Sequence, residues 1–121
     1  MLSNKIIDFS FMKSSNHIIY DFQRTKYTEV AEETAKNNNI KLYQGAYVYT
    51  MGPSYETPSE IKEIISLGGK AVGMSTLSEY LKSIELKQNF LIVSCLTNYG
   101  AGLKNTKITH KEVLVNAKKY E

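Results

Sequence analysis

Polar side chains that could bind a ligand follow three apolar segments of the sequence. Segment 44–50 precedes Tyr55 and Glu56, segment 70–74 precedes Ser75, and segment 90–96 precedes Asn98. A carboxylate accepts hydrogen bonds, an amide both donates and accepts them, and a hydroxyl at a helix N-terminus suits an anion. Because the carboxyl ends of parallel strands meet at one edge of a sheet, we expect these groups to form a single site.

Each of these residues also has a purely structural interpretation. Glu56 stands near the start of a predicted helix, whose dipole stabilises a carboxylate, and Asn98 opens a loop, as asparagine often does. Ser75 is suited to capping a helix, although Thr76 competes for that role. Tyr55 is explained as well by packing as by stacking on a ligand. From the residues alone, the structural interpretation of Glu56 and Asn98 is the stronger one.

The segment around Glu56 is expected to run from a strand through a rigid turn into a helix. Thr57 and Glu60 have the spacing of a capping box, in which each side chain bonds the backbone N–H of the other residue. Pro58 occupies the first helical position, where a helix tolerates proline best. The side chains expected on the buried face are Ile61, Ile64, Ile65 and Leu67. Gly68-Gly69 is expected to end the helix.

Further elements complete an alternating pattern of strands and helices. The first is a strand with Ile6, Ile7, Phe9 and Phe11, and the second is a helix over 25–37 whose buried face would carry Tyr27, Val30, Ala31, Thr34 and Ala35. Strands are expected over 70–74 and 90–96. Two more helices are expected where Thr76 with Glu79 and Thr109 with Glu112 have the spacing of a capping box. This pattern predicts an α/β fold with a mainly parallel sheet flanked by helices. The apolar segment 90–96 is typical of a strand covered on both faces, so Cys95 is expected to be an inert core thiol.

Composition indicates one small globular domain. The chain has 121 residues, of which 42% are hydrophobic, enough for a single core. The net charge of +3 comes from scattered groups, 15 basic and 12 acidic, so we expect no nucleic-acid partner. No apolar run is long enough for a bilayer and no signal-peptide pattern is present, which favours a cytoplasmic protein without a membrane partner. The histidines and the lone cysteine lack metal-ligand spacing, so no metal is expected.

Four segments match, in order and in approximate spacing, the motifs of one known family. They are Gly45-Ala46-Tyr47 with Gly52-Pro53-Ser54-Tyr55-Glu56-Thr57, Val72-Gly73-Met74-Ser75-Thr76 with Glu79, Ser94 to Asn98, and Thr109-His110 with Glu112-Val113. On these segments the chain resembles the trimeric purine nucleoside phosphorylases and the related methylthioadenosine phosphorylases. The match covers roughly residues 43 to 116, and four ordered segments are more specific than any one short motif.

The resemblance implies that the predicted site binds a purine. Glu56 would bind the Watson–Crick edge of the base, and Tyr55 would stack on its face. Asn98 would bind N7 and the 6-oxo group, and it would stabilise the negative charge that the base gains as the glycosidic bond breaks. Glu56 and Asn98 are therefore the expected catalytic residues. Relatives that act on 6-aminopurine thionucleosides have aspartate in place of this asparagine, so Asn98 points to inosine and guanosine.

The resemblance also implies contacts for the rest of a nucleoside and for phosphate. Met74 would lie under the ribose, and Ser75 would contact phosphate. Tyr47 and His110 would lie near the ribose 5′ end, where His110 would hydrogen-bond the 5′-hydroxyl. The implied reaction is reversible phosphorolysis of 6-oxopurine nucleosides in purine salvage, with inorganic phosphate as co-substrate and no cofactor. The implied assembly is a homotrimer.

Members of that family are considerably longer than this chain. The chain resembles their carboxyl-terminal half, as one partial domain over 1–121 with 1–24 as a poorly matched lead-in. The other half would supply a glycine-containing phosphate loop with an arginine and a histidine, whereas the only arginine here is Arg24. We therefore expect self-association and very low activity of the chain alone. A truncated gene product, half of a split enzyme and an expressed portion of a longer chain all stay open.

Two other functional classes were weighed against the enzyme. One is a folded remnant without catalytic activity that binds purine or other chains. The other is a nucleoside hydrolase, which is less favoured because such an enzyme needs a positioned water and a base, and the sequence identifies neither.

Overall fold

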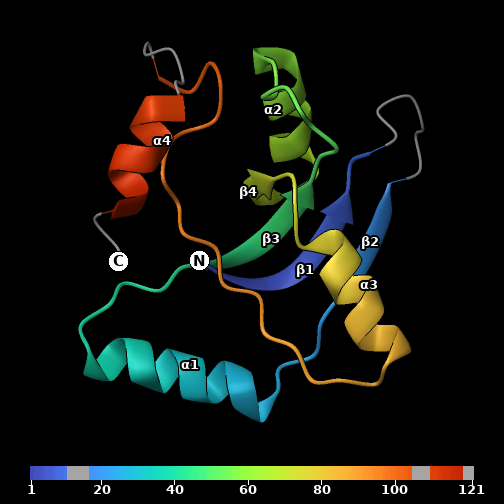
Figure 1. The fold of residues 1–121 in the computed structure, drawn as a ribbon, viewed down its shortest axis with the longest axis vertical. Helices are drawn as coiled ribbons and strands as arrows, with labels where there is room; N and C mark the ends of the chain where they lie inside the picture. Colours follow the sequence, from blue (N-terminus) through green and yellow to red (C-terminus); the bar gives the residue numbers. More distant parts are fainter. Residues whose placement is uncertain (11–16, 105–109, 119–121) are drawn as a thin grey trace.

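The structure, a computed structural model, describes residues 1–10, 17–104 and 110–118, and Figure 1 shows their arrangement. The strands are β1 (Leu2–Asp8), β2 (Ile18–Asp21), β3 (Gln44–Tyr49) and β4 (Gly69–Gly73). The helices are α1 (Lys26–Asn37), α2 (Pro58–Ser66), α3 (Leu77–Glu85) and α4 (His110–Ala117). Phe11 and Thr109, which were assigned to a strand and a helix cap, lie outside the described residues.

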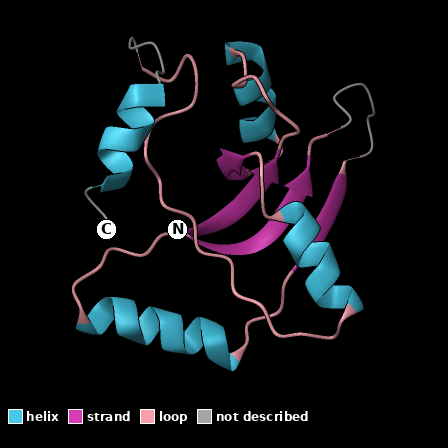
Figure 2. Ribbon diagram, viewed as in Figure 1, coloured by secondary structure: helices cyan, strands magenta, loops and turns pink. Residues whose placement is uncertain are grey.

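The strands form a four-stranded sheet in the order β2-β1-β3-β4 (Figure 2). β3 is parallel to β1 on one side and to β4 on the other, whereas β2 is antiparallel to β1. The prediction of an α/β fold with a mainly parallel sheet is therefore confirmed. The strands predicted near 44–50 and 70–74 are also confirmed, and they are direct neighbours.

One face of the sheet is covered by α2. Ile7 of β1 and Val48 of β3 are register partners and are fully buried. They share a core with Ile61 and Ile64, which lie one helical turn apart on α2. Burial of these side chains holds α2, and with it the loop that precedes α2, against the sheet.

The opposite face of the sheet is covered by α3. Ile6 and Tyr47, each next in sequence to a residue of the first core, form a second core with Leu77 and Tyr80 of α3. Neighbouring residues of a strand point to opposite faces, so a shift of β3 by one residue would exchange the two cores. Both faces of β3 are thus specified by the side chains that they bury.

The predicted start of α2 is confirmed. The Thr57 backbone N–H donates to Glu60 Oε2 at 2.5 Å, and the Glu60 N–H donates to Thr57 Oγ1 at 3.3 Å. Pro58 is the first helical residue. At the other end, Gly68 has φ of 84°, a left-handed conformation that glycine adopts without strain. The turn and helix around Glu56 therefore form from local signals, as expected.

The predicted capping box of α3 is not formed, although the helix is present. Thr76 occupies the cap position with φ of 85° and makes no side-chain cap hydrogen bond. A β-branched residue in that region is strained. The hydroxyl of Thr76 consequently does not serve the role that its spacing from Glu79 suggested.

The predicted third parallel strand over 90–96 is wrong. This segment, orange in Figure 1, runs beside the first residues of β1, with an isolated antiparallel bridge between Leu2 and Val93. Ser94 donates its backbone N–H to the Met1 carbonyl at 2.8 Å. Val93 is 58% exposed, and Cys95 is exposed too rather than a core thiol. Phe90 and Ile92 are half-buried and pack against the second core, whereas Leu91, Val93 and Leu96 are exposed, so the segment is not covered on both faces.

Two of the predicted helix faces are more exposed than expected. Ile65 of α2 is 48% exposed, while Leu67 packs partly against the core. α1 starts after Thr25 and ends at the asparagines, as predicted, but Ala35 is the one residue of its stripe that is buried. α1 lies across the amino-terminal side of the strands and leaves both sheet faces to α2 and α3 (Figure 1).

Over the described ranges, no helix has the length and apolarity to cross a membrane.

The adjacent isoleucines of α2 allow a matched test of this packing. Ile64→Ala should lower the free energy of unfolding by about 2–5 kcal/mol, since it leaves a cavity between α2 and the sheet. Ile65→Ala, at the exposed neighbouring position, should change it by less than about 1 kcal/mol. Urea unfolding followed by circular dichroism measures both. Equal losses would show that α2 does not pack through the Ile64 face.

Candidate functional site

The candidate site is built on the carboxyl ends of β3 and β4. Thr50, the first residue after β3, donates its backbone N–H to the carbonyl of Gly73 at 3.0 Å, which joins the two strand ends. Its hydroxyl donates to Oε1 of Glu56 at 2.7 Å. Thr50 is buried and Glu56 is half-buried. The carboxylate predicted to bind a ligand is therefore held by a side chain that is itself fixed in the sheet.

Gly52 lies in the turn between Thr50 and Glu56 and packs closely on Met74. It has φ of 65°, and a Cβ there would lie 2.7 Å from Sδ of Met74. The backbone conformation favours glycine, and a larger residue would also displace the methionine side chain. The Gly52–Pro53 peptide bond is cis. The contact places Met74, which follows β4, against the turn that leads to Tyr55 and Glu56.

Tyr47 lies in the core beneath the site. It is 5% exposed, and its hydroxyl donates to the backbone carbonyl of Ser75 at 2.8 Å. Gly73 makes room for it, because a Cβ at that position would lie 2.5 Å from the tyrosine hydroxyl. Tyr47 thus links β3 to the turn between β4 and α3. Its predicted place near a ribose stays a prediction.

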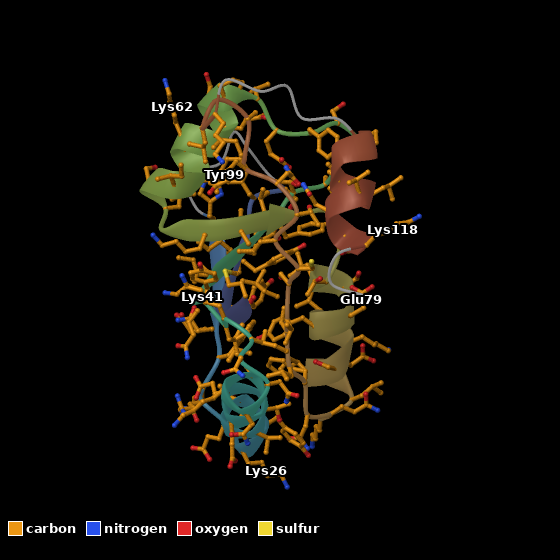
Figure 3. All side chains as sticks on the ribbon, turned by 90° about the vertical axis from the view of Figure 1, so that its left-hand side faces the viewer. Lys26, Lys41, Lys62, Glu79, Tyr99 and Lys118 are labelled. Atoms are coloured by element: carbon orange, nitrogen blue, oxygen red, sulfur yellow. The ribbon has the colours of Figure 1, made fainter. Side chains whose placement is uncertain are left out.

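The start of α3 carries negative charge close to Ser75. Hydrogen bonds from its own backbone N–H and from the Ser78 hydroxyl lower the pKa of the Glu79 carboxyl below its ordinary value. Figure 3 shows Glu79 on the flank of the molecule. The Ser75 side chain is exposed. A phosphate at Ser75 would therefore share the helix N-terminus with a carboxylate, and the predicted phosphate contact remains untested.

Asn98 lies in an exposed loop that returns to α2. Its Nδ2 donates to the carbonyl of Tyr99 at 3.1 Å, and its Oδ1 accepts a hydrogen bond from the Thr97 hydroxyl at 2.8 Å. Two residues on, Gly100 lies so close to α2 that a Cβ would stand 2.9 Å from Cδ1 of Ile61. A Cβ at Gly102 would likewise stand 2.9 Å from Cβ of Pro58. The loop is thus packed on the helix that begins just after Glu56.

His110 is the first residue of α4, and its side chain lies outside the described part of the chain. α4 is tied to the Asn98 loop, since Nδ2 of Asn116 donates to the carbonyl of Thr97 at 2.7 Å. The structure therefore places Glu56 and Met74 on the loops that follow the neighbouring ends of β3 and β4. It places Ser75 next to them and the Asn98 loop along α2.

The residue of the candidate site that the sequence did not predict is Thr50. A hydroxyl at the end of β3 is in place to orient the carboxylate of Glu56 across the turn. The available signal was a threonine between an apolar strand and a glycine-proline turn. Strand-end threonines are common, so that signal alone does not identify an orienting residue.

Arg24, the sole arginine, lies far from this arrangement in the fold. It precedes α1 beside the first residues of β1 and β3, at the opposite edge of the sheet. Its guanidinium pairs with Glu32, and its Nε lies 3.6 Å from a carboxylate oxygen of Glu29. The arginine fork that suits phosphate best is therefore engaged elsewhere.

Two cavities of the structure lie away from the candidate site. A cavity of about 210 Å³ and another of about 360 Å³ lie near α1 and residues 88–92, and no predicted site residue lines either of them. Among the described residues, no three histidine, cysteine or acidic side chains are grouped as a metal would require.

Comparisons with known proteins agree with the predicted family. The family model described as Phosphorylase superfamily matches residues 8–121, and the chain belongs to this superfamily. Purine nucleoside phosphorylase 1 of Geobacillus stearothermophilus is 37% identical over 91 residues, which are 75% of this chain and 33% of that protein. A probable 6-oxopurine nucleoside phosphorylase of Dictyoglomus turgidum is 36% identical over an alignment of 128 positions, which covers 94% of this chain and 48% of that protein.

Solved structures show the same relationship. The crystal structure of a Schistosoma purine nucleoside phosphorylase in complex with hypoxanthine aligns with a TM-score of 0.64 and 34% identity, over 75% of this chain and 32% of that one. The Schistosoma mansoni enzyme in complex with inosine aligns with a TM-score of 0.63 at the same identity of 34%. The chain spans between 32% and 48% of the length of these proteins. Its sheet and helices therefore form part of a nucleoside phosphorylase fold.

The hydrogen bond from Tyr47 can be tested by a substitution that removes only the hydroxyl. Tyr47→Phe should lower the free energy of unfolding by about 0.5–1.5 kcal/mol, because the Ser75 carbonyl loses its donor. Tyr99→Phe is the matched control, since Tyr99 is 59% exposed. Urea unfolding compares the two variants with the parent chain. A loss no larger than that of the control would argue against this link between β3 and the β4–α3 turn.

Proposed function

We propose that this chain forms the purine-binding part of a purine nucleoside phosphorylase that acts on inosine and guanosine. The observation that carries the proposal is the carboxylate of Glu56, oriented by Thr50 at the joined ends of two parallel strands. Support also comes from relatives named purine and 6-oxopurine nucleoside phosphorylase. Further support comes from similar structures in complex with hypoxanthine, inosine and guanosine.

In this proposal, Glu56 and Asn98 recognise the base and assist its departure. The carboxylate accepts hydrogen bonds from N–H groups of the purine, and the Thr50 hydroxyl keeps it oriented without a change on binding. Asn98 donates toward the base as phosphate attacks the anomeric carbon and the glycosidic electrons move onto the purine. A donor placed where negative charge develops lowers the barrier most. Tyr55, whose side chain is 45% exposed, stacks on the base.

The rest of the nucleoside and the phosphate complete the proposed site. Met74 supports the ribose, and His110 with Tyr47 marks its 5′ end. Ser75 contributes one contact to phosphate, and we assign the remaining phosphate contacts to a part of the enzyme outside this chain. No cofactor or metal is needed, since phosphate is itself the nucleophile.

The proposed setting is purine salvage in the cytoplasm, in a homotrimer. Association is supported by large apolar side chains on the surface, among them Leu91, Val93 and Leu96 of the segment beside β1, each of which is at least 41% exposed. Apolar patches of this kind favour contact with further protein surface.

Purine affinity should depend on the pair of Thr50 and Glu56. Glu56→Ala should weaken hypoxanthine binding by about 1–3 kcal/mol, because a buried N–H of the base is left unpaired. Thr50→Val removes the orienting hydroxyl and should weaken it by about 0.5–1.5 kcal/mol, whereas Thr50→Ser keeps the hydroxyl and should stay close to the parent chain. Isothermal titration calorimetry gives the affinities. Parent-like binding in both Glu56→Ala and Asn98→Ala would reject the site.

Activity should be low in the 121-residue chain and rise when phosphate contacts are supplied. Each missing oxyanion-type donor slows turnover by about 10²–10³. We therefore expect barely measurable phosphate-dependent release of hypoxanthine from inosine by this chain alone. Fusion of the amino-terminal segment of a relative should restore it. Rapid turnover by the chain alone would show that its own residues suffice to bind phosphate.

A further inference from the structure

Segment 88–97 crosses the first residues of β1 as an extended chain without a turn or bend. The Ile92 carbonyl accepts a hydrogen bond from the Ser3 N–H at 3.0 Å, and the Ser94 N–H donates to the Met1 carbonyl at 2.8 Å. The backbone on the side that faces β1 is therefore paired, as it would be in a strand.

The other side of this segment is an open backbone edge. Successive residues of an extended chain direct their backbone groups to opposite sides, so those of Leu91, Val93 and Cys95 point away from β1. None of these groups bonds another residue that the structure describes. The side chains are exposed as well, with Val93 at 58% and Leu91 at 41%. An unpaired edge with apolar side chains is a template for pairing with a further strand.

The edge lacks the charges that normally prevent such pairing. Natural edge strands are protected by lysine, other charged side chains or proline. The outer strands of the sheet follow this rule, because β4 carries the exposed Lys70 and β2 carries the exposed Asp21. From Gln88 to Asn98 the sequence contains no charged residue and no proline. Nothing in the sequence of this edge therefore opposes a second strand.

The segment is complementary to a second copy of itself. In an antiparallel pair with a two-fold axis at Val93, this residue lies opposite its own copy, and Leu91 lies opposite Cys95 of the second copy. The uncharged polar residues 88–89 then lie opposite the equally polar residues 97–98. Apolar side chains meet apolar ones along the middle of the pair, and polar side chains meet at both ends.

The structure leaves room for the second strand beside this edge. The cavity of about 360 Å³ lies between the segment and α1, and it is lined by Tyr27, Val30 and Ala31 together with residues 89–91. In the two-fold arrangement, residues 95–97 of the second copy lie opposite residues 89–91. Leu96 of that copy, 43% exposed in the single chain, thereby reaches an apolar cavity.

We propose that two copies of this chain associate through residues 88–98, paired as antiparallel strands about a two-fold axis at Val93. The pairs Val93–Val93 and Leu91–Cys95 exchange their backbone N–H···O bonds, and their side chains form an apolar ladder on the exposed face. This contact is isologous, whereas a ring of three is built from heterologous contacts. It is therefore additional to the contacts of the proposed homotrimer, and it does not depend on the proposed phosphorylase activity.

Charge at Val93 tests the axis directly, because this residue meets its own copy. In sedimentation experiments the parent chain should associate with rising concentration to dimers, or to hexamers if the trimer also forms. Val93→Lys and Val93→Glu should each weaken this association by about tenfold or more, since like charges meet at the axis. An equimolar mixture of the two variants should recover it, because opposite charges then meet. Ile84→Lys, at a position of α3 that is 51% exposed, is the matched control.

A second pair of variants covers the case in which charge at Val93 prevents folding, which circular dichroism would reveal. Leu91→Lys should weaken association, and Leu91→Lys combined with Cys95→Glu should restore it, because these positions face each other only between two copies. A monomeric parent, association that the charged variants leave unchanged, or no recovery in either pair would overturn the proposal. A parent that stays monomeric and binds the amino-terminal segment of a relative through this edge would also overturn it.

Discussion

The structure depends on the parallel pairing of β3 between β1 and β4. This central strand sends Tyr47 to one face and Val48 to the other, and each of these side chains anchors a helix on its own side. Strand alternation makes the two contacts inseparable, since a shift by one residue would lose both. The end of β3 is therefore fixed in space, and this fixes the starting point of the turn that follows it.

The candidate site uses this fixed point. Thr50 completes the ladder with its backbone and holds Glu56 with its side chain, so one residue transmits the position of the sheet to a carboxylate in a loop. Met74 approaches the same turn from β4 and packs against Gly52. The predicted site loop with Asn98 is held differently, by packing on the first turns of α2. Two of the three predicted site loops thus follow strand ends, and the third packs on a helix.

Features that depend on residues within one turn, such as the capping box of Thr57 with Glu60, were predictable from the sequence. The parallel strands on either side of α2 were predictable for another reason, because apolar strand segments alternate with a helix along the chain. The course of segment 90–96 was not predictable, because an apolar run becomes a covered strand only when other elements pack on both of its faces. The capping box predicted at Thr76 did not form for a related reason, since the backbone of Thr76 after β4 has φ of 85° despite the capping tendency of threonine. The role of Thr50 depends on a contact across a turn, which spacing alone does not reveal.

The exposure of Cys95 has a practical consequence. It is the only cysteine in the sequence, and its side chain is exposed on the segment that runs beside the first residues of β1. Thiol reagents act on accessible cysteines, so a single maleimide dye or spin label can be attached at one known position. The chain thereby carries an intrinsic attachment point for a spin label, whose broadening of NMR signals reports which residues lie near this segment without introducing or removing any residue.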